Sequence, residues 1–189
     1  MLTALGNILP LPGEDSVPHP VDICIHLGRT KRFAGHGSAE WTVLHHSLLT
    51  TLLCLKNFGA TSAVAALVHD LHEYVTGDLP TPVKRCLTGT AELEKHVDKA
   101  IGDSLGLAES SEEDKKIVKV CDIAALLIES HYFGPAGTFE HIGVRDWPNI
   151  PEQIQDEVYS VIRKSCPEIA EAMRNSHSYW PTALRASKS

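Results

Sequence analysis

A histidine and an aspartate stand next to each other at His69 and Asp70, at the end of a short apolar run. The run predicts a helix over residues 61–75, and neighbouring residues on one helix diverge by about 100° around its axis. An imidazole and a carboxylate at this spacing can meet one ion only if other segments bring further ligands to the same place. The rest of the chain must therefore supply partners for this doublet.

Two residues on other predicted helices have the right chemistry. His46 lies on the helix expected over residues 41–57, and Asp122 on the helix expected over residues 114–132. Two imidazoles and two carboxylates suit a divalent cation such as Mn²⁺, Co²⁺, Fe²⁺ or Zn²⁺, and they leave positions open for water and a substrate oxygen, which indicates catalysis. The competing interpretation is that ordinary hydrogen bonds satisfy these side chains inside a helical bundle.

Glu73 follows His69 by four positions and Asp70 by three, which places it on the same face of the predicted helix. A carboxylate there can orient or deprotonate a water beside the metal. The alternative is a solvated glutamate at a helix end. The longer pattern HDLHEYVTGDLPTPVK favours the functional interpretation, together with RFAG at residues 32–35 and TVLHHSLL at residues 42–49.

The elements that position these residues are expected to be helical throughout. Residues 1–20 are rich in proline and predict an irregular segment, and residues 181–189 predict a frayed tail. Between them, apolar residues recur at helical spacing and strong strand patterns are missing, so we expect an all-α protein with one domain over residues 1–189. The expected helices cover residues 22–31, 41–57, 61–75, 90–105, 114–132, 151–164 and 168–176.

The composition narrows the class of protein. Of the 189 residues, 43% are hydrophobic and 22% are charged, which is typical of a globular domain. The net charge of -7 argues against a general nucleic-acid surface, which needs a basic face. Five cysteines without a CxxC pair predict reduced thiols and a cytoplasmic protein. The first residues are too broken by glycine and proline for a signal peptide or membrane span, so no membrane partner is expected.

From about Asp22 to Glu129 the sequence resembles the HD-domain phosphohydrolases, in the branch of the YfbR-like 5'-deoxynucleotidases and the phage dATP triphosphohydrolases of the DatZ type. The motifs quoted above carry this resemblance. It implies an all-α HD-domain helical bundle and a divalent metal ion (Co²⁺, Mn²⁺, Zn²⁺ or Mg²⁺). The ligands of this metal ion would be His46, His69, Asp70 and Asp122. The first ligand is the histidine of a V-x-x-H-S string, which selects His46 rather than His45.

The resemblance also implies a substrate pocket. Arg32 would hold a substrate phosphate while the Phe33 ring packs against sugar or base, in agreement with the planar donors of arginine and the stacking face of an aromatic ring. Asp78 would contact the sugar 3'-hydroxyl. Two flanking residues could also take part: Pro80 would stiffen the pocket wall, and Lys84 is either a second phosphate contact or a solvated lysine. Trp41 could reach the substrate or belong to the core.

The expected activity is hydrolysis of a deoxynucleotide, with Glu73 and Arg32 as catalytic residues. Release of triphosphate from a deoxynucleoside triphosphate such as dATP is favoured by the phage-type resemblance and by the basic residues Arg29 and Lys31 near Arg32. The alternatives are a 5'-deoxynucleotidase acting on monophosphates and a non-catalytic nucleotide sensor. A homo-oligomer, dimer or hexamer, is expected from the resemblance, located in the host cytoplasm if the chain is phage-encoded.

Overall fold

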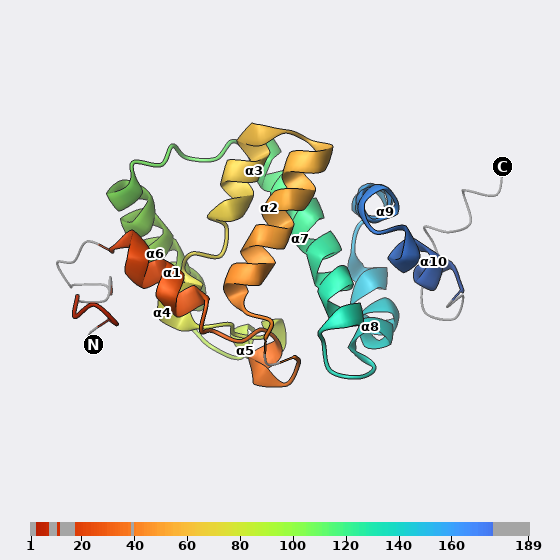
Figure 1. The fold of residues 1–189 in the computed structure, drawn as a ribbon, viewed down its shortest axis with the longest axis horizontal. Coiled ribbons are helices and arrows are strands. Elements are labelled where there is room, and N and C mark those ends of the chain that lie inside the picture. Colours follow the sequence, from red (N-terminus) through yellow and green to blue (C-terminus); the bar gives the residue numbers. More distant parts are fainter. Residues whose placement is uncertain (1–2, 8–10, 12–17, 39, 176–189) are drawn as a thin grey trace. The chain divides into compact units, whose positions relative to one another are not determined.

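The computed structural model describes residues 3–7, 11, 18–38 and 40–175. Within these ranges the protein is all-α, as predicted, and the extended pairing is limited to one isolated antiparallel bridge between Lys31 and Thr42. The helices of the described chain follow one another in Figure 1 as α1 (Pro20–Leu27), η1 (Phe33–Gly35), α2 (Val43–Asn57), α3 (Ala60–Leu67), α4 (Glu73–Thr76), α5 (Thr81–Lys84), α6 (Thr90–Leu105), α7 (Glu112–Tyr132), α8 (Thr138–His141), η2 (Ile142–Asp146), η3 (Trp147–Asn149), α9 (Glu152–Ser165) and α10 (Pro167–Asn175).

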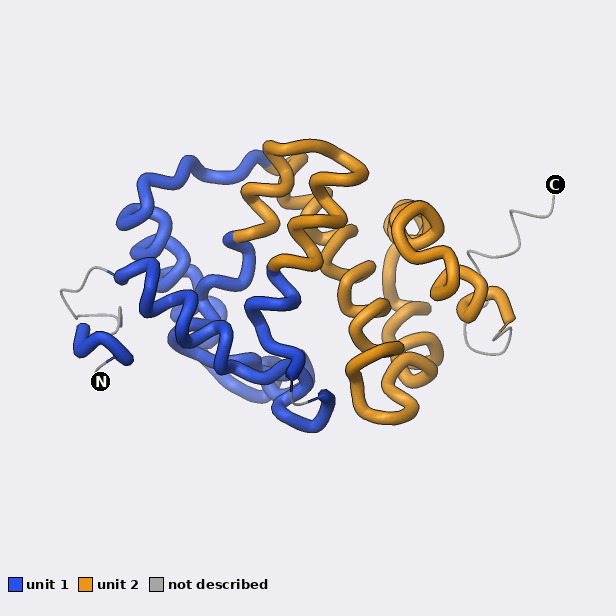
Figure 2. Tube along the Cα trace, in the orientation of Figure 1, with its two compact units in different colours: residues 1–47, 68–111 blue, residues 48–67, 112–189 orange. Residues whose placement is uncertain are grey.

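The chain divides into two compact units, coloured separately in Figure 2. Unit 1 comprises residues 1–47 and 68–111, and unit 2 comprises residues 48–67 and 112–189. Each unit is therefore built from two separate stretches of sequence. The predicted frayed tail, residues 181–189, lies outside the described residues.

Unit 1 is built around a small apolar core in which α4 contacts both α1 and α6. The buried members of this core are Ile23, Leu27, Val43, Tyr74, Val97 and Ile101. Helix α6 has the predicted bounds, and its apolar stripe buries Val97 and Ile101 completely. Burial of a full aliphatic side chain stabilises the fold by about 1.5–3 kcal/mol, so this stripe fixes α6 and the polar residues beside it.

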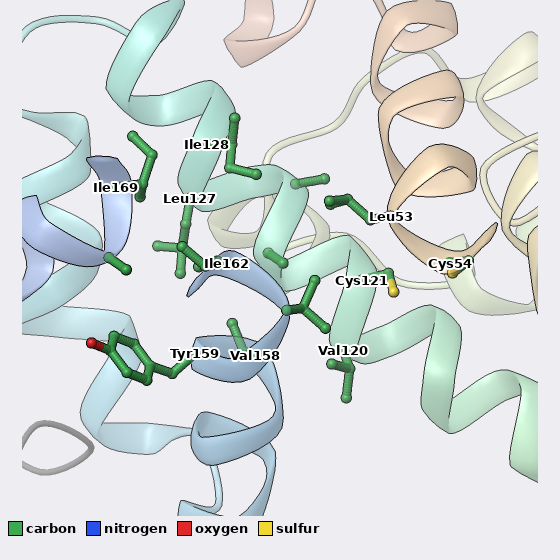
Figure 3. Packing of buried hydrophobic residues seen from close by; sticks show 14 of the residues in the cluster. Leu53, Cys54, Val120, Cys121, Leu127, Ile128, Val158, Tyr159, Ile162 and Ile169 are labelled. Carbon is green, nitrogen blue, oxygen red and sulfur yellow. The ribbon is translucent and has the colours of Figure 1, made fainter. Parts of the chain in front are cut away.

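Unit 2 is organised by α7, which packs against α3 and α9, while α9 packs against α10. Figure 3 shows this core, with Cys54 of α2 facing Cys121 of α7. Helices α9 and α10 match the predicted helices 151–164 and 168–176 to within a residue or two. Cys54 and Cys121 are both buried free thiols, in agreement with the expectation of reduced cysteines.

The helix predicted over residues 61–75 is interrupted, so this prediction was wrong in one respect. α3 ends at Leu67, residues 68–72 form consecutive turns, and α4 begins at Glu73. In the turns the backbone bonds join residues three apart, from Leu71 N–H to the Val68 carbonyl and from Glu73 N–H to the Asp70 carbonyl. His69 and Asp70 therefore lie on a tight turn rather than on a regular helix.

The first helix is also shorter than predicted at its C-terminal end. α1 stops at Leu27 rather than near Lys31, because turns follow it and Lys31 then pairs with Thr42 in an isolated antiparallel bridge. The proline-rich stretch after Gly77 ends α4, as expected, and then starts the single turn α5. Pro82 fits there because the first turn of a helix needs no N–H donor.

Candidate metal centre

Three of the four predicted metal ligands belong to unit 1, and the structure brings them together. The Nε2 atoms of His46 and His69 lie 3.4 and 3.3 Å from the same oxygen of Asp70, Oδ2. The two imidazole rings are 5.3 Å apart between centroids. The ligand atoms of the three residues all lie within 4.8 Å of one another, which is close enough for one metal ion to bind all three.

His46 is completely buried in the first turns of α2, and its neighbour His45 has a different place. His45 Nδ1 accepts the Thr42 backbone N–H at 3.3 Å and lies 2.9 Å from the Thr42 hydroxyl. This contact satisfies a free donor at the start of the helix, as the side chain of a capping box does. The His45 ring also stacks on Trp41, 5.1 Å away. His45 thus caps the N-terminus of α2, whereas His46 contacts Asp70.

Glu73 adds a second carboxylate to the group. It is buried, and its Oε2 accepts no hydrogen bond from the residues that the structure describes. Its pKa is raised to about 8, mainly by burial and further by Asp70 and Asp78, while Arg32 and His72 act in the opposite direction. One ligand atom each from Asp70, His72 and Glu73 also lies within 4.8 Å of the others.

This chemistry fits a divalent cation. Imidazole nitrogens and carboxylate oxygens are the donors that such ions take, and the geometry of His46, His69 and Asp70 is that of converging ligands. Burial is the main cause of the raised pKa of Glu73, and the nearby carboxylates Asp70 and Asp78 add to it. A bound cation would stabilise these carboxylates in their charged form, since an ion is often the largest local charge in such a site.

Two of the predicted substrate contacts form a pair in the same unit. Arg32 Nη1 lies 3.0 Å from Asp78 Oδ1, and both side chains are 11% exposed. The Arg32 guanidinium also lies 5.9 Å from the centre of the Phe33 ring. Phe33 and the following Ala34 have φ values of 56° and 50°, in the left-handed region that residues with a Cβ rarely adopt. Strain of this kind often accompanies functional loops.

Lys84 forms an ion pair with an acidic residue of α6 while its side chain stays 28% exposed, and its contact with a phosphate stays a prediction. Its Nζ lies 2.9 Å from Glu94 Oε1 of α6. Burial alone would lower its pKa, but Glu94 outweighs this, with smaller contributions from Glu73 and Asp70, so the pKa is raised and the side chain stays charged.

Pro80 directly precedes the helical turn that carries Lys84. The substrate roles of Pro80 and Trp41 stay predictions.

Three residues near this group were not singled out by the sequence analysis: His72, Glu94 and Asp98. His72 is buried and contacts both acidic side chains, with Nδ1 3.3 Å from Asp98 and Nε2 3.7 Å from Glu94. The position of His72 inside the string HDLHE was a usable signal. The spacing of Glu94 and Asp98 by one helical turn was another, since such residues share a helix face.

Asp122, the fourth predicted ligand, belongs to unit 2. It lies on α7, where its Oδ2 is 3.0 Å from Lys119 Nζ and its side chain is 25% exposed. Its participation in the metal centre stays a prediction.

The described fold and site define an all-α protein with a His/Asp/Glu group that could hold a metal ion. Among the described residues, no helix has both the length and the apolar character that a bilayer span requires. No family model matches the chain.

The chain is 31% identical over 142 residues to "Uncharacterized protein YfdR" of Escherichia coli strain K12, which covers 75% of this chain and 72% of that protein. It is also 33% identical over 125 residues to "Uncharacterized protein RCAP_rcc00048" of Rhodobacter capsulatus, covering 60% of this chain and 64% of that protein. The chain belongs to the same family as YfdR.

Proposed function

We propose that this protein is a metal-dependent phosphohydrolase of the HD-domain type that releases triphosphate from a deoxynucleoside triphosphate such as dATP. The observation that carries the proposal is the convergence of His46 Nε2 and His69 Nε2 on Asp70 Oδ2. Two imidazoles and a carboxylate leave coordination positions open, as a catalytic metal needs. The resemblance in the surrounding motifs supplies the reaction class and the deoxynucleotide substrate.

A divalent cation such as Mn²⁺ or Co²⁺, held by His46, His69 and Asp70, would supply Lewis-acid activation and neutralise charge on the reacting phosphate. Asp122 is the proposed fourth ligand. Glu73 orients the attacking water and accepts its proton, because its carboxylate is buried beside Asp70. Burial is the main cause of the raised pKa of Glu73, about 8, and a cation bound beside it would favour the ionised carboxylate.

Arg32 orients the substrate phosphate in this proposal. Its planar guanidinium can bind a phosphate with two donors, and the ion pair with Asp78 holds it in place beforehand. Phe33 offers its ring to the sugar or base, and the Arg32–Phe33 contact keeps the two groups adjacent.

A 5'-deoxynucleotidase acting on monophosphates is the second candidate, and one observation favours it. Both cations predicted to bind phosphate already have a carboxylate partner, Arg32 with Asp78 and Lys84 with Glu94. A triphosphate brings more negative charge than a monophosphate and needs more cationic partners. The exposed residues Arg29 and Lys31 are the other positive charges close to Arg32 in sequence.

The test is product analysis. The Mn²⁺- or Co²⁺-loaded protein is incubated separately with each deoxynucleoside monophosphate and triphosphate, and nucleoside, phosphate and triphosphate are resolved by chromatography. Deoxyadenosine and triphosphate from dATP support the main proposal. Phosphate released only from monophosphates would assign the 5'-deoxynucleotidase activity instead, and nucleotide binding without any product would indicate a sensor.

A further inference from the structure

His72 stands between the ligand Asp70 and the buried Glu73 in the chain, and two carboxylates of α6 contact it. Asp98 Oδ1 accepts the His72 backbone N–H at 3.1 Å and lies 3.3 Å from the ring Nδ1. Glu94 Oε1 lies 3.7 Å from the ring Nε2. Both the backbone and the side chain of His72 are therefore tied to α6.

The segment that these contacts hold is the one that carries the metal ligands. Residues 68–72 have no regular helix to stiffen them, and the hydrogen bond from Leu71 N–H to the Val68 carbonyl is long, at 3.4 Å. A chain of tight turns with poor hydrogen-bond geometry is a weak support for ligands that must converge within a few tenths of an ångström. External anchors are needed to keep His69 and Asp70 in place.

Helix α6 is suited to be that anchor. Val97 and Ile101 fix it in the core of unit 1, and both are completely buried. Glu94 and Asp98 are one turn apart on the same helix. Glu94 also binds Lys84 Nζ at 2.9 Å, so α6 holds α5 as well as the turn.

We propose that Glu94 and Asp98 are positioning residues of the metal centre, which fix the turn bearing His69 and Asp70 through His72. This inference rests on the proposed function only in requiring that the centre binds a divalent cation. Residues that orient metal ligands without touching the ion commonly have a strong influence on metal affinity, and their loss weakens metal binding about 10–100-fold. The Asp98 carboxylate accepts the backbone N–H of His72. Removal of this carboxylate should therefore weaken metal binding more than removal of the Glu94 carboxylate.

The experiment measures Mn²⁺ binding by isothermal titration calorimetry, together with urea unfolding. The variants are Asp98→Ala, Asp98→Asn and Glu94→Gln. Asp103→Ala is the matched control, because Asp103 is an exposed carboxylate on the same helix that pairs with Lys99 at 2.6 Å. We expect Asp98→Ala to weaken Mn²⁺ binding about tenfold. Asp98→Asn keeps an acceptor for the His72 N–H and should recover most of the affinity, whereas Asp103→Ala should change it less than about twofold.

A purely structural role would lower stability in Asp98→Ala without changing the affinity of the folded protein for Mn²⁺, and this result would overturn the inference. If Asp98→Ala does not fold, Glu94→Gln decides: weaker Mn²⁺ binding at unchanged cooperativity of unfolding supports the inference, and unchanged binding overturns it. If the unsubstituted protein binds no Mn²⁺, both the proposed function and this inference fall. If it binds Mn²⁺ and Asp98→Ala binds it equally well, only this inference falls.

Discussion

Arg32 and Asp78 are 46 positions apart in the chain, yet their side chains form an ion pair of 3.0 Å in which each is 11% exposed. Both residues were predicted to contact the substrate. The pair holds the guanidinium beside Asp78 before any substrate binds.

The first prediction concerns the strength of this pair. A double-mutant cycle with Arg32→Gln and Asp78→Asn should give a coupling energy of about 1–3 kcal/mol, because breaking a poorly solvated pair leaves one buried charge uncompensated. Urea unfolding of the four proteins measures it. The pair Lys99–Asp103, whose side chains are 74% and 69% exposed, is the control and should couple by less than about 0.5 kcal/mol. Additive effects at Arg32 and Asp78 would contradict the prediction.

Residues 90–105 show how much of this fold follows from the sequence. Apolar residues at helical spacing lie between Gly89 and Gly106, and both glycines adopt positive φ values at the ends of the helix. The pattern and the end signals agree, so the predicted bounds were correct. The break at Leu67 is the opposite case. Leu67, Leu71 and Val75 keep a helical spacing through the break, so the local pattern contains no stop signal.

The candidate site also contains residues that the sequence predicts and residues that it does not. The types and spacing of His46, His69 and Asp70 suggested a ligand set, and three side chains from two distant segments do converge. The supporting residues could not be predicted in this way. Glu94 and Asp98 are ordinary acidic residues of an amphipathic helix in the sequence, and only the packing of α6 places them against His72.

The second prediction concerns the metal ligands. His69→Ala should weaken Mn²⁺ binding at least about 100-fold because it removes one of three converging donors. The fold should persist, since the His69 side chain is partly exposed and no apolar core is lost. His96→Ala, an exposed histidine on α6, is the control. Calorimetry with Mn²⁺ measures the affinity, and circular dichroism measures the fold. Equal affinity of His69→Ala and the unsubstituted protein would contradict the assignment.

The third prediction concerns Asp122, the proposed fourth ligand, which belongs to unit 2. Asp122→Ala should weaken Mn²⁺ binding about tenfold or more if the carboxylate completes the ligand set. Lys119→Ala, which removes only the ion-pair partner of Asp122, should leave binding intact or strengthen it slightly. The same titration distinguishes these outcomes. Unchanged affinity in Asp122→Ala would remove Asp122 from the set.

The fourth prediction concerns acid stability at Asp22. Burial alone would raise the pKa of this carboxyl, but hydrogen bonds from the Thr3 hydroxyl, the Asn7 amide and the Leu5 N–H outweigh it, so the pKa is lowered from 3.8. A lowered folded-state pKa stabilises the fold above the unfolded value, and this contribution is lost as the pH falls through the folded value. Asp22→Asn should therefore be less stable at pH 7. The difference should shrink below about pH 4, as measured by urea unfolding. A constant difference down to pH 2 would contradict it.

The fifth prediction concerns the glycine after α7. A Cβ at Gly134 would lie 2.8 Å from the Ser130 carbonyl oxygen, which is backbone and cannot move aside. Gly134→Ala should lower the free energy of unfolding by about 1–3 kcal/mol. Gly102→Ala is the matched control within α6, where no atom lies within 4 Å of the added Cβ, and it should raise stability by about 0.5–1 kcal/mol. Thermal or urea unfolding compares the two, and equal effects would contradict the steric explanation.

The most direct test of the central claim is metal removal followed by reloading. The protein is stripped with EDTA, and release of triphosphate from dATP is measured before and after one equivalent of Mn²⁺ is added, with the Asp70→Asn variant in parallel. We predict no release by the stripped protein, release after reloading, and less than about 1% of that rate in Asp70→Asn, because a catalytic metal ligand is lost. Undiminished release by the stripped protein, or full activity of the reloaded Asp70→Asn variant, would contradict the proposed metal-dependent mechanism.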